Sequence, residues 1–201
     1  TTTLAGVDAA NYTLTQPTGL TASITDTVIY ANAFTGASLC PTNGNLPAMA
    51  ANATGTPVTR ATITCNATAN VFNSTTLNNT ASLSATSYIE FSATATAGNV
   101  LNVNSVSFFR QASNSAPNQL EVRYSTDGFA TFTTWGAAPN SSPSGTVATW
   151  DFTNFTTPTA GTVTFRIYPF GTQRADLTGA SSTTGTFRVD DVTIYGTVSA
   201  A

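Results

Sequence analysis

The feature that most constrains the fold is the strict alternation of apolar and polar residues through the second half of the chain. Three such runs place the apolar sets Ile89/Phe91/Ala93, Leu120/Val122/Tyr124 and Val163/Phe165/Ile167 at every second position. A period of two puts each set on one face of a β-strand. Gly, Pro, Asn and Ser interrupt the runs at spacings typical of antiparallel sandwiches. We therefore predict an all-β, antiparallel β-sandwich.

Two breaks in the alternation predict irregularities within strands. Leu101 and Val103 lie at odd-numbered positions, whereas Val106 lies at an even-numbered one. The strand must therefore change phase at Asn104-Ser105 if all three side chains are to share one face. The apolar residues on either side of Asp190-Asp191 are also out of phase. One extra residue restores the phase, and a β-bulge provides it. A hairpin turn is expected at Asp127-Gly128.

Composition excludes several classes of function. The chain has 201 residues with six basic residues, all arginine, nine acidic residues and no histidine, for a net charge of −3. Without histidine, neither a Ser–His–Asp triad nor a histidine-ligated metal can be built. An acidic chain without lysine lacks the clustered positive charge that nucleic acid requires. With 41% hydrophobic and 10% aromatic residues, the composition favours a folded domain over a disordered stalk.

Several features indicate an extracellular or cell-surface location. The chain contains two cysteines, Cys40 and Cys65, which are either buried thiols or one disulfide. Their even number, the Thr- and Asn-rich composition and the lack of lysine favour the disulfide in an exported protein. No apolar run is long enough for a membrane span. The start at Thr1 without methionine suggests a processed polypeptide or a fragment. The main candidate N-glycosylation sites are Asn52, Asn66, Asn73 and Asn140.

Residues 1–26 form a separate segment in this interpretation. They contain the short runs NYTLT and LTASIT around a QPTG turn, and they are too short to build a core. We expect an extended β segment that donates strands to a neighbouring copy, with residues 27–201 forming the sandwich. The apolar and aromatic side chains expected at that subunit interface are Tyr12, Leu14, Leu20 and Ile24.

Two resemblances add to this. The runs Tyr88–Phe129, Val163–Gly171 and Thr186–Gly196 look like a jelly-roll module of secreted and cell-surface proteins of Bacteroidota-type bacteria. This module is also similar to carbohydrate-binding jelly rolls. The segment Ala5–Thr25 resembles the last two strands of an adhesin-type Ig-like repeat. The resemblance implies a jelly-roll fold and a role in surface attachment or carbohydrate binding.

In the jelly rolls that this chain resembles, the DDV position often holds a structural Ca²⁺. Here that position is occupied by Asp190 and Asp191. The early strand, where a further acid is expected, offers Asn32 and Ala33 instead. Two interpretations stay open: a Ca²⁺ site, or one aspartate paired with an arginine while the other caps the bulge.

Charged and aromatic residues suggest a carbohydrate-binding face. The candidates are Arg123, Tyr124, Arg166, Tyr168 and Trp135. Aromatic faces would stack on a sugar, and guanidinium groups would hydrogen bond to its hydroxyls. The alternatives are a solvated ion-pair lattice for the arginines and a core position for Trp135.

We expect no enzymatic activity, because the only two glutamates lie in mid-strand beside arginines and no nucleophile motif is present. The function favoured by the sequence is a subunit of an extracellular filament or adhesin, joined to copies of itself through residues 1–26. The alternative is a carbohydrate-binding module of a larger secreted protein, with polysaccharide as partner. No cofactor is expected beyond the Ca²⁺ considered above.

Overall fold

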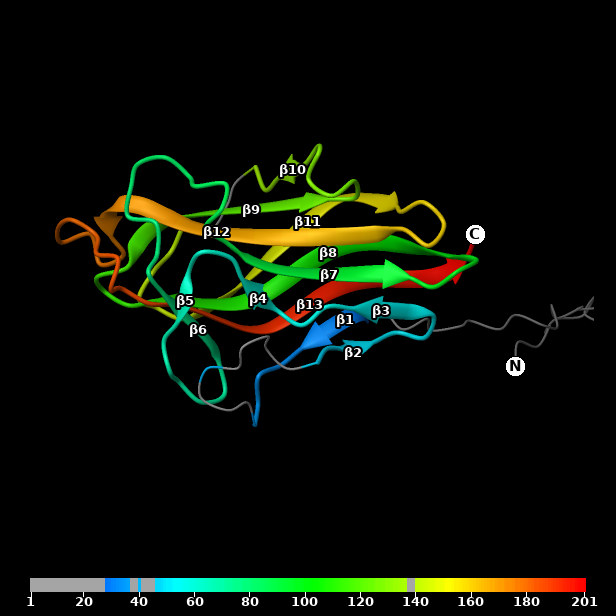
Figure 1. Cartoon of the computed structure of the whole chain (residues 1–201), viewed down its shortest axis with the longest axis horizontal. Helices are drawn as coiled ribbons and strands as arrows, with labels where there is room; N and C mark the ends of the chain where they lie inside the picture. The colour runs from blue at the N-terminus through cyan, green and yellow to red at the C-terminus, as the bar shows by residue number, and fades with distance from the viewer. Residues whose placement is uncertain (1–27, 37–39, 41–45, 137–139) are drawn as a thin grey trace, which may run out of the picture.

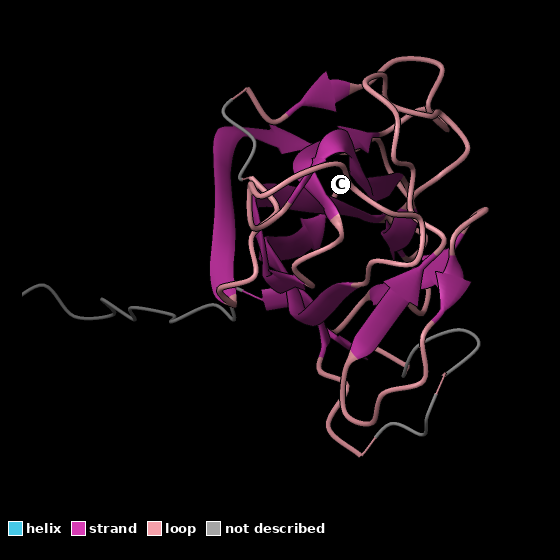
Figure 2. Cartoon of the chain, turned by 90° about the vertical axis from the view of Figure 1, so that its left-hand side faces the viewer, coloured by secondary structure: helices cyan, strands magenta, loops and turns pink. Residues whose placement is uncertain are grey.

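The computed structural model describes residues 28–36, 40, 46–136 and 140–201. In this part of the chain every regular element is a strand, and no helix is present to cross a membrane (Figure 2). The strands are β1 (Val28–Asn32), β2 (Ala48–Met49), β3 (Ala53–Gly55), β4 (Thr59–Arg60), β5 (Thr64–Cys65), β6 (Phe72–Thr75), β7 (Ile89–Ala95), β8 (Asn99–Ala112), β9 (Pro117–Ser125), β10 (Thr133–Thr134), β11 (Thr146–Thr156), β12 (Thr162–Arg174) and β13 (Phe187–Ala200).

These strands form two antiparallel sheets, which we name after their central strands (Figure 1). The β13 sheet has the order β11-β8-β13-β1-β2, with β6 beside β13 and β5 beside β6. The β12 sheet has the order β10-β9-β12-β7-β3, with β4 beside β7. From β7 onwards, successive long strands alternate between the sheets. The set β1-β13-β8-β11 lies against β7-β12-β9-β10, which is the jelly-roll arrangement. The expectation of an all-β jelly-roll sandwich is confirmed.

The core fills the space between the two sheets with the residues that the alternation selected. Phe91 and Phe165 come from adjacent strands of the β12 sheet, and their rings stack with centroids 5.4 Å apart. Phe108 and Ile194 come from the β13 sheet and are fully buried in the same cluster. Burying such side chains contributes roughly 1.5–3 kcal/mol each, so this layer holds the sheets together.

Both predicted phase breaks are present. Asn104 is skipped in the register of β8 with β11 and with β13, so Val103 and Val106 both reach the core. At the second break, the register of β13 with β8 shifts between Asp190 and Thr193. Asp191 takes a positive φ of 47° there, which lets Val189 and Val192 both point inward.

The first third of the described chain covers one side of the sandwich. The described chain begins with β1, which pairs with β13. Cys40 and Cys65 form a disulfide that ties the chain after β1 to β5. Residues 1–26, with the predicted interface residues Tyr12, Leu14, Leu20 and Ile24, lie outside the described residues. The Ig-like resemblance of Ala5–Thr25 lies there too.

Candidate functional site

The outer face of the β12 sheet carries a row of charged residues across three strands. Arg166 on β12 lies opposite Glu90 on β7 and, on its other side, opposite Arg123 on β9. All three side chains have the parity that points away from the core, as their sequence positions predicted. Two arginines facing each other would repel, so each needs its own partner.

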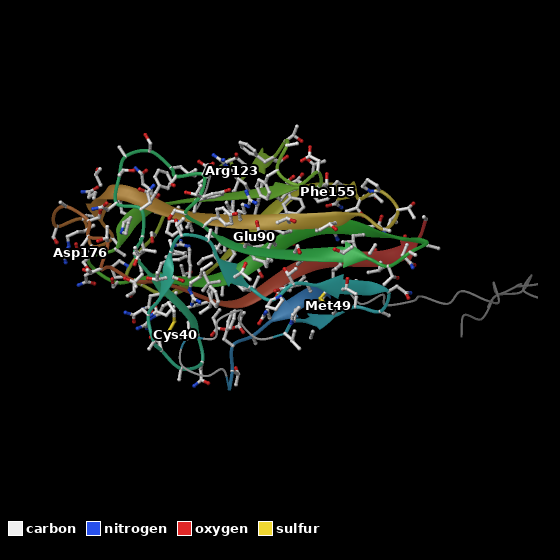
Figure 3. The ribbon with its side chains drawn as sticks, in the orientation of Figure 1. Cys40, Met49, Glu90, Arg123, Phe155 and Asp176 are labelled. Carbon is white, nitrogen blue, oxygen red and sulfur yellow. A yellow bond between two sulfur atoms is a disulfide. The ribbon has the colours of Figure 1, made fainter. Side chains whose placement is uncertain are left out.

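Each arginine of this row is paired with one of the two glutamates. The Arg166 Nε lies 2.6 Å from Glu90 Oε2, and the Arg123 Nε lies 2.5 Å from Glu121 Oε1 (Figure 3 labels Glu90 and Arg123). Burial opposes the charged form of Arg166, but the hydrogen bonds and charge interactions with Glu90 and Tyr168 together outweigh it and raise the pKa of the guanidinium. The predicted ion-pair lattice is therefore present, and it holds both guanidinium groups in fixed positions.

Aromatic rings lie against both guanidinium groups. The Arg166 Cζ lies 3.7 Å from the ring centroid of Phe129 and 4.2 Å from that of Tyr88. The Arg123 Cζ lies 4.1 Å from the centroid of Phe132. Such contacts are attractive because the faces of aromatic rings carry negative potential. We call Tyr88, Glu90, Glu121, Arg123, Phe129, Phe132 and Arg166 the arginine–aromatic patch.

The turn after β9 places the two phenylalanines on this face. Asp127 accepts hydrogen bonds from the backbone N and Oγ1 of Thr131 and from the Oγ of Ser125. These bonds lower the pKa of Asp127 to about 2. Phe129 follows with a positive φ of 67°, which turns the chain back over the sheet. In the sequence, Asp127-Gly128 predicts the turn itself. The alternation of residues within a strand does not show where the aromatic rings after such a turn will lie.

Tyr168 occupies the centre of the face below the patch. It is only 2% exposed, and its ring meets that of Tyr88 edge-on at 5.5 Å. Burial raises the pKa of its hydroxyl. Tyr168 therefore supports the patch from beneath and is not accessible as a stacking platform.

The remaining predicted carbohydrate residues face the other way. Tyr124 lies on the core side of β9, where it stacks on Phe155 at 4.7 Å. Trp135 stacks on Trp150 of β11 at 5.6 Å. Both rings fill the space between the two sheets, so the structure divides the predicted set: Arg123 and Arg166 belong to the outer face, whereas Tyr124 and Trp135 belong to the core.

Asp190 and Asp191 are placed at the bulge of β13. The Oδ1 of Asp190 accepts the backbone N–H groups of Phe34 and Asp191, so this aspartate caps the bulge. Burial and the charge of Asp190 raise the pKa of Asp191. Within the described ranges no group of three acidic, Cys or His side chains is suited to a metal ion. Calcium is usually held by six to eight oxygens with several carboxylates among them, and the Ca²⁺ site at Asp190 and Asp191 stays a prediction.

The four predicted glycosylation sites differ in accessibility. Asn52 and Asn66 are exposed, and so is Asn140. Asn73 is 1% exposed, and its Nδ2 donates hydrogen bonds to Asn66 Oδ1 and Thr68 Oγ1. Attaching a glycan would replace one of the two N–H groups of this buried nitrogen and so break one of the bonds, which disfavours Asn73 as an acceptor in the folded chain.

Three solved structures share some similarity with this chain. The match to a CBM4 structure covers 69% of this chain and 77% of the CBM4 chain, with 15% identity and a TM-score of 0.38. The K2 cleaved adhesin domain of Lys-gingipain covers 82% and 97%, also with 15% identity and a TM-score of 0.38. A family 11 carbohydrate-binding module from Clostridium thermocellum, in complex with a β-1,3-1,4-mixed-linked tetrasaccharide, covers 84% and 97%, with 13% identity and a TM-score of 0.32.

No protein-family model matches the sequence, and no curated protein matches it. The identities and TM-scores of the three structures are too low to transfer a ligand or a binding residue to this chain.

Proposed function

We propose that this chain is a carbohydrate-binding module of an exported protein and that the arginine–aromatic patch is its binding surface. The observation that carries the proposal is the exposed ring of Phe132, 49% exposed, held beside the fixed Arg123–Glu121 pair. A flat apolar ring next to oriented polar groups matches a sugar, which has one apolar face and a rim of hydroxyls. Binding sites commonly combine apolar walls with a few placed polar groups in this way.

The patch is preorganised, which favours binding. Arg123 and Arg166 are each fixed by a glutamate and by a ring, so little side-chain entropy is lost when a ligand is bound. The hydroxyls of Thr133 and Thr134 on β10 lie at the same edge of the sheet and are exposed. A glycan running from β12 towards β10 would meet rings first and hydroxyls at its end.

We assign the patch no catalytic role. Glycoside hydrolysis needs one carboxyl group that stays protonated to act as the acid. Glu90 and Glu121 are both in ion pairs with arginine, an arrangement suited to recognition. The Cys40–Cys65 disulfide supports the extracellular location proposed for the protein.

The test is the binding of neutral polysaccharides by the wild-type chain and two matched variants. Phe132→Ala removes the exposed ring of the patch. Leu177→Ala removes a similarly exposed apolar side chain at 64% exposure, in the turn after β12. In affinity electrophoresis through soluble β-glucan, xylan and mannan, we expect at least one polymer to retard the wild type. Phe132→Ala should abolish the retardation and Leu177→Ala should retain it. Equal retardation of both variants would refute the proposed surface.

A second candidate function is the filament or adhesin subunit, and the free edge of β11 favours it. Among the described residues, β11 pairs only with β8, which leaves the other edge of its eleven residues open for strand addition. The sandwich already has its eight jelly-roll strands, so residues 1–26 of a neighbour would add to this edge and not replace a missing strand. Electron microscopy of the full chain tests this, since regular fibres are expected from it and isolated particles would exclude it.

A further inference from the structure

A small pocket lies at the outer face of the β13 sheet, away from the arginine–aromatic patch. It has a volume of about 240 Å³ and is lined chiefly by Gln111, Ser113, Asn114, Pro143, Thr186 and Arg188. Two of these residues, Gln111 and Arg188, lie opposite each other on β8 and β13. A pocket of this size is smaller than those that enclose a drug-sized ligand, so it suits one unit of a larger molecule.

Arg188 differs from the arginines of the patch in having no carboxylate partner among the described residues. Its Nη1 donates to the Oε1 of Gln111 at 3.3 Å, and its Nε and Nη2 have no hydrogen-bond partner in the same part of the chain. The nearest acid in sequence on its face is Asp190, which accepts two backbone N–H groups instead. The Nε and Nη2 of Arg188 are thus available as hydrogen-bond donors on the side of the molecule where the pocket lies.

The pocket wall is held in place by hydrogen bonds between its strands and loops. Ser113 and Thr186 are joined twice, through the Thr186 N–H to Ser113 Oγ and the Ser113 N–H to Thr186 O, each at 2.8 Å. The Nε2 of Gln111 donates to the carbonyl of Pro143 at 2.9 Å. The orientation of Arg188 and Gln111 therefore does not depend on a ligand.

The local charge is positive even though the chain is acidic overall. Arg110, adjacent to Gln111, donates to the carbonyl of Asn140 and is in no ion pair among the described residues. Arg110 lies opposite the buried Val189 and so has the parity of the inner face, which leaves Arg188 as the positive charge that lines the pocket. An anion is the complement to such a site.

We infer that this pocket binds the carboxylate of an acidic sugar, such as a uronic acid unit of a polysaccharide. A single planar guanidinium matches the two oxygens of a carboxylate. The other polar groups, on Ser113, Asn114 and Thr186, are neutral and match sugar hydroxyls. A phosphate monoester, with up to two negative charges, would call for further cations in the pocket. This site is separate from the proposed patch and does not depend on it.

The test is titration of the full chain with oligogalacturonate, followed by isothermal calorimetry and by amide NMR. We expect Arg188→Gln to weaken binding at least tenfold and Arg188→Lys to weaken it by less. Arg174→Gln serves as the control, because it makes the same change in net charge at an arginine that is already paired with Asp176. The amide signals of Ser113 and Thr186 should shift on titration in the wild type.

The outcomes separate the alternatives. Carboxyl-reduced oligosaccharide should not bind at this site, which identifies the carboxylate as the recognised group. Equal weakening by Arg188→Gln and Arg174→Gln would show general charge attraction and overturn the site. Stronger binding of a peptide carboxylate than of the sugar acid would overturn the assignment to glycans. Phe132→Ala, which tests the patch, reports separately on the neutral polysaccharides.

Discussion

Tyr124 and Phe155 stack face to face across the open side of the sandwich, with centroids 4.7 Å apart and planes 7° apart. Tyr124 belongs to β9 of the β12 sheet, whereas Phe155 belongs to β11 of the β13 sheet. Phe152 and Trp150 pack on the same tyrosine ring at 5.0 and 5.4 Å. This aromatic cluster joins the two sheets by side-chain packing, at a place where no strand belongs to both sheets.

The first prediction concerns this cluster. Tyr124→Ala should lower the free energy of unfolding by about 2–3 kcal/mol, since it leaves a cavity among four rings. Tyr124→Phe should cost less than about 0.5 kcal/mol, because the ring is kept and its hydroxyl makes no hydrogen bond among the described residues. Urea denaturation measures both. A double-mutant cycle with Phe155→Ala should give a coupling of about 1 kcal/mol, and no coupling would contradict the stacking.

The second prediction concerns Asp127 and the turn that carries Phe129 and Phe132. The folded-state pKa is lowered from 3.8 to about 2, so the ionised carboxylate stabilises the fold. That contribution is complete above about pH 4 and is lost as the pH falls towards 2. Carbon NMR of the Asp127 carboxyl group should show a midpoint near 2. A midpoint near 3.8 would mean that the bonds to Thr131 are not formed in solution.

The third prediction concerns Gly196, where β13 and β8 shift register. Gly196 has a φ of +149°, and a Cβ placed there would lie 2.0 Å from the carbonyl oxygen of Asn102 and 2.8 Å from Ile29 Cδ1. Gly196→Ala should therefore destabilise the fold by roughly 2 kcal/mol or more. Gly98→Ala is the control, because Gly98 also has a positive φ but nothing within 4 Å. Thermal unfolding should show a clearly larger loss at Gly196, and similar losses would be inconsistent with the close approach.

The fourth prediction concerns the disulfide between Cys40 and Cys65, which are 25 residues apart. Replacing both cysteines by serine should lower the free energy of unfolding by about 3 kcal/mol, chiefly because the unfolded chain gains freedom. Cys65 lies on β5, two strands away from the central β13, so the jelly-roll core should survive. The near-ultraviolet circular dichroism of the core aromatics should stay native-like in the double variant. Loss of that signal at 25 °C would show that the core depends on the disulfide.

The fold was largely predictable from the sequence because a buried face imposes a period of two. The alternation around Phe91, Val122 and Phe165 gave the strands and their inner faces, and the phase breaks gave the bulges at Asn104 and Asp191. Which strand pairs with which depends on contacts far apart in the sequence. A local pattern carries no such information, so the division into two sheets came only from the structure.

The candidate site was predictable only in part. Parity correctly placed Arg123 and Arg166 on the outer face, and it also placed Tyr124 on the inner one, where the structure has it. The positions of Phe129 and Phe132 depend on a turn that Asp127 stabilises. Unlike a strand, this turn has no repeating sequence pattern from which the positions could be predicted. The pocket at Arg188 could not be predicted from a local pattern either, since residues from three separate parts of the chain, on strands and loops, form its walls.

The position of β13 has a consequence for how the protein is made. This strand, Phe187–Ala200, lies between β8 and β1 at the centre of its sheet. Until it emerges from the ribosome or from an export channel, β1 and β8 have no strand between them and the sheet cannot close. The β13 sheet can therefore be completed only after nearly the whole of the described chain is available, because its central contacts are far apart in the sequence. A polypeptide that carries β1 and β8 but lacks Phe187–Ala200 is therefore expected to leave this sheet split between its two halves.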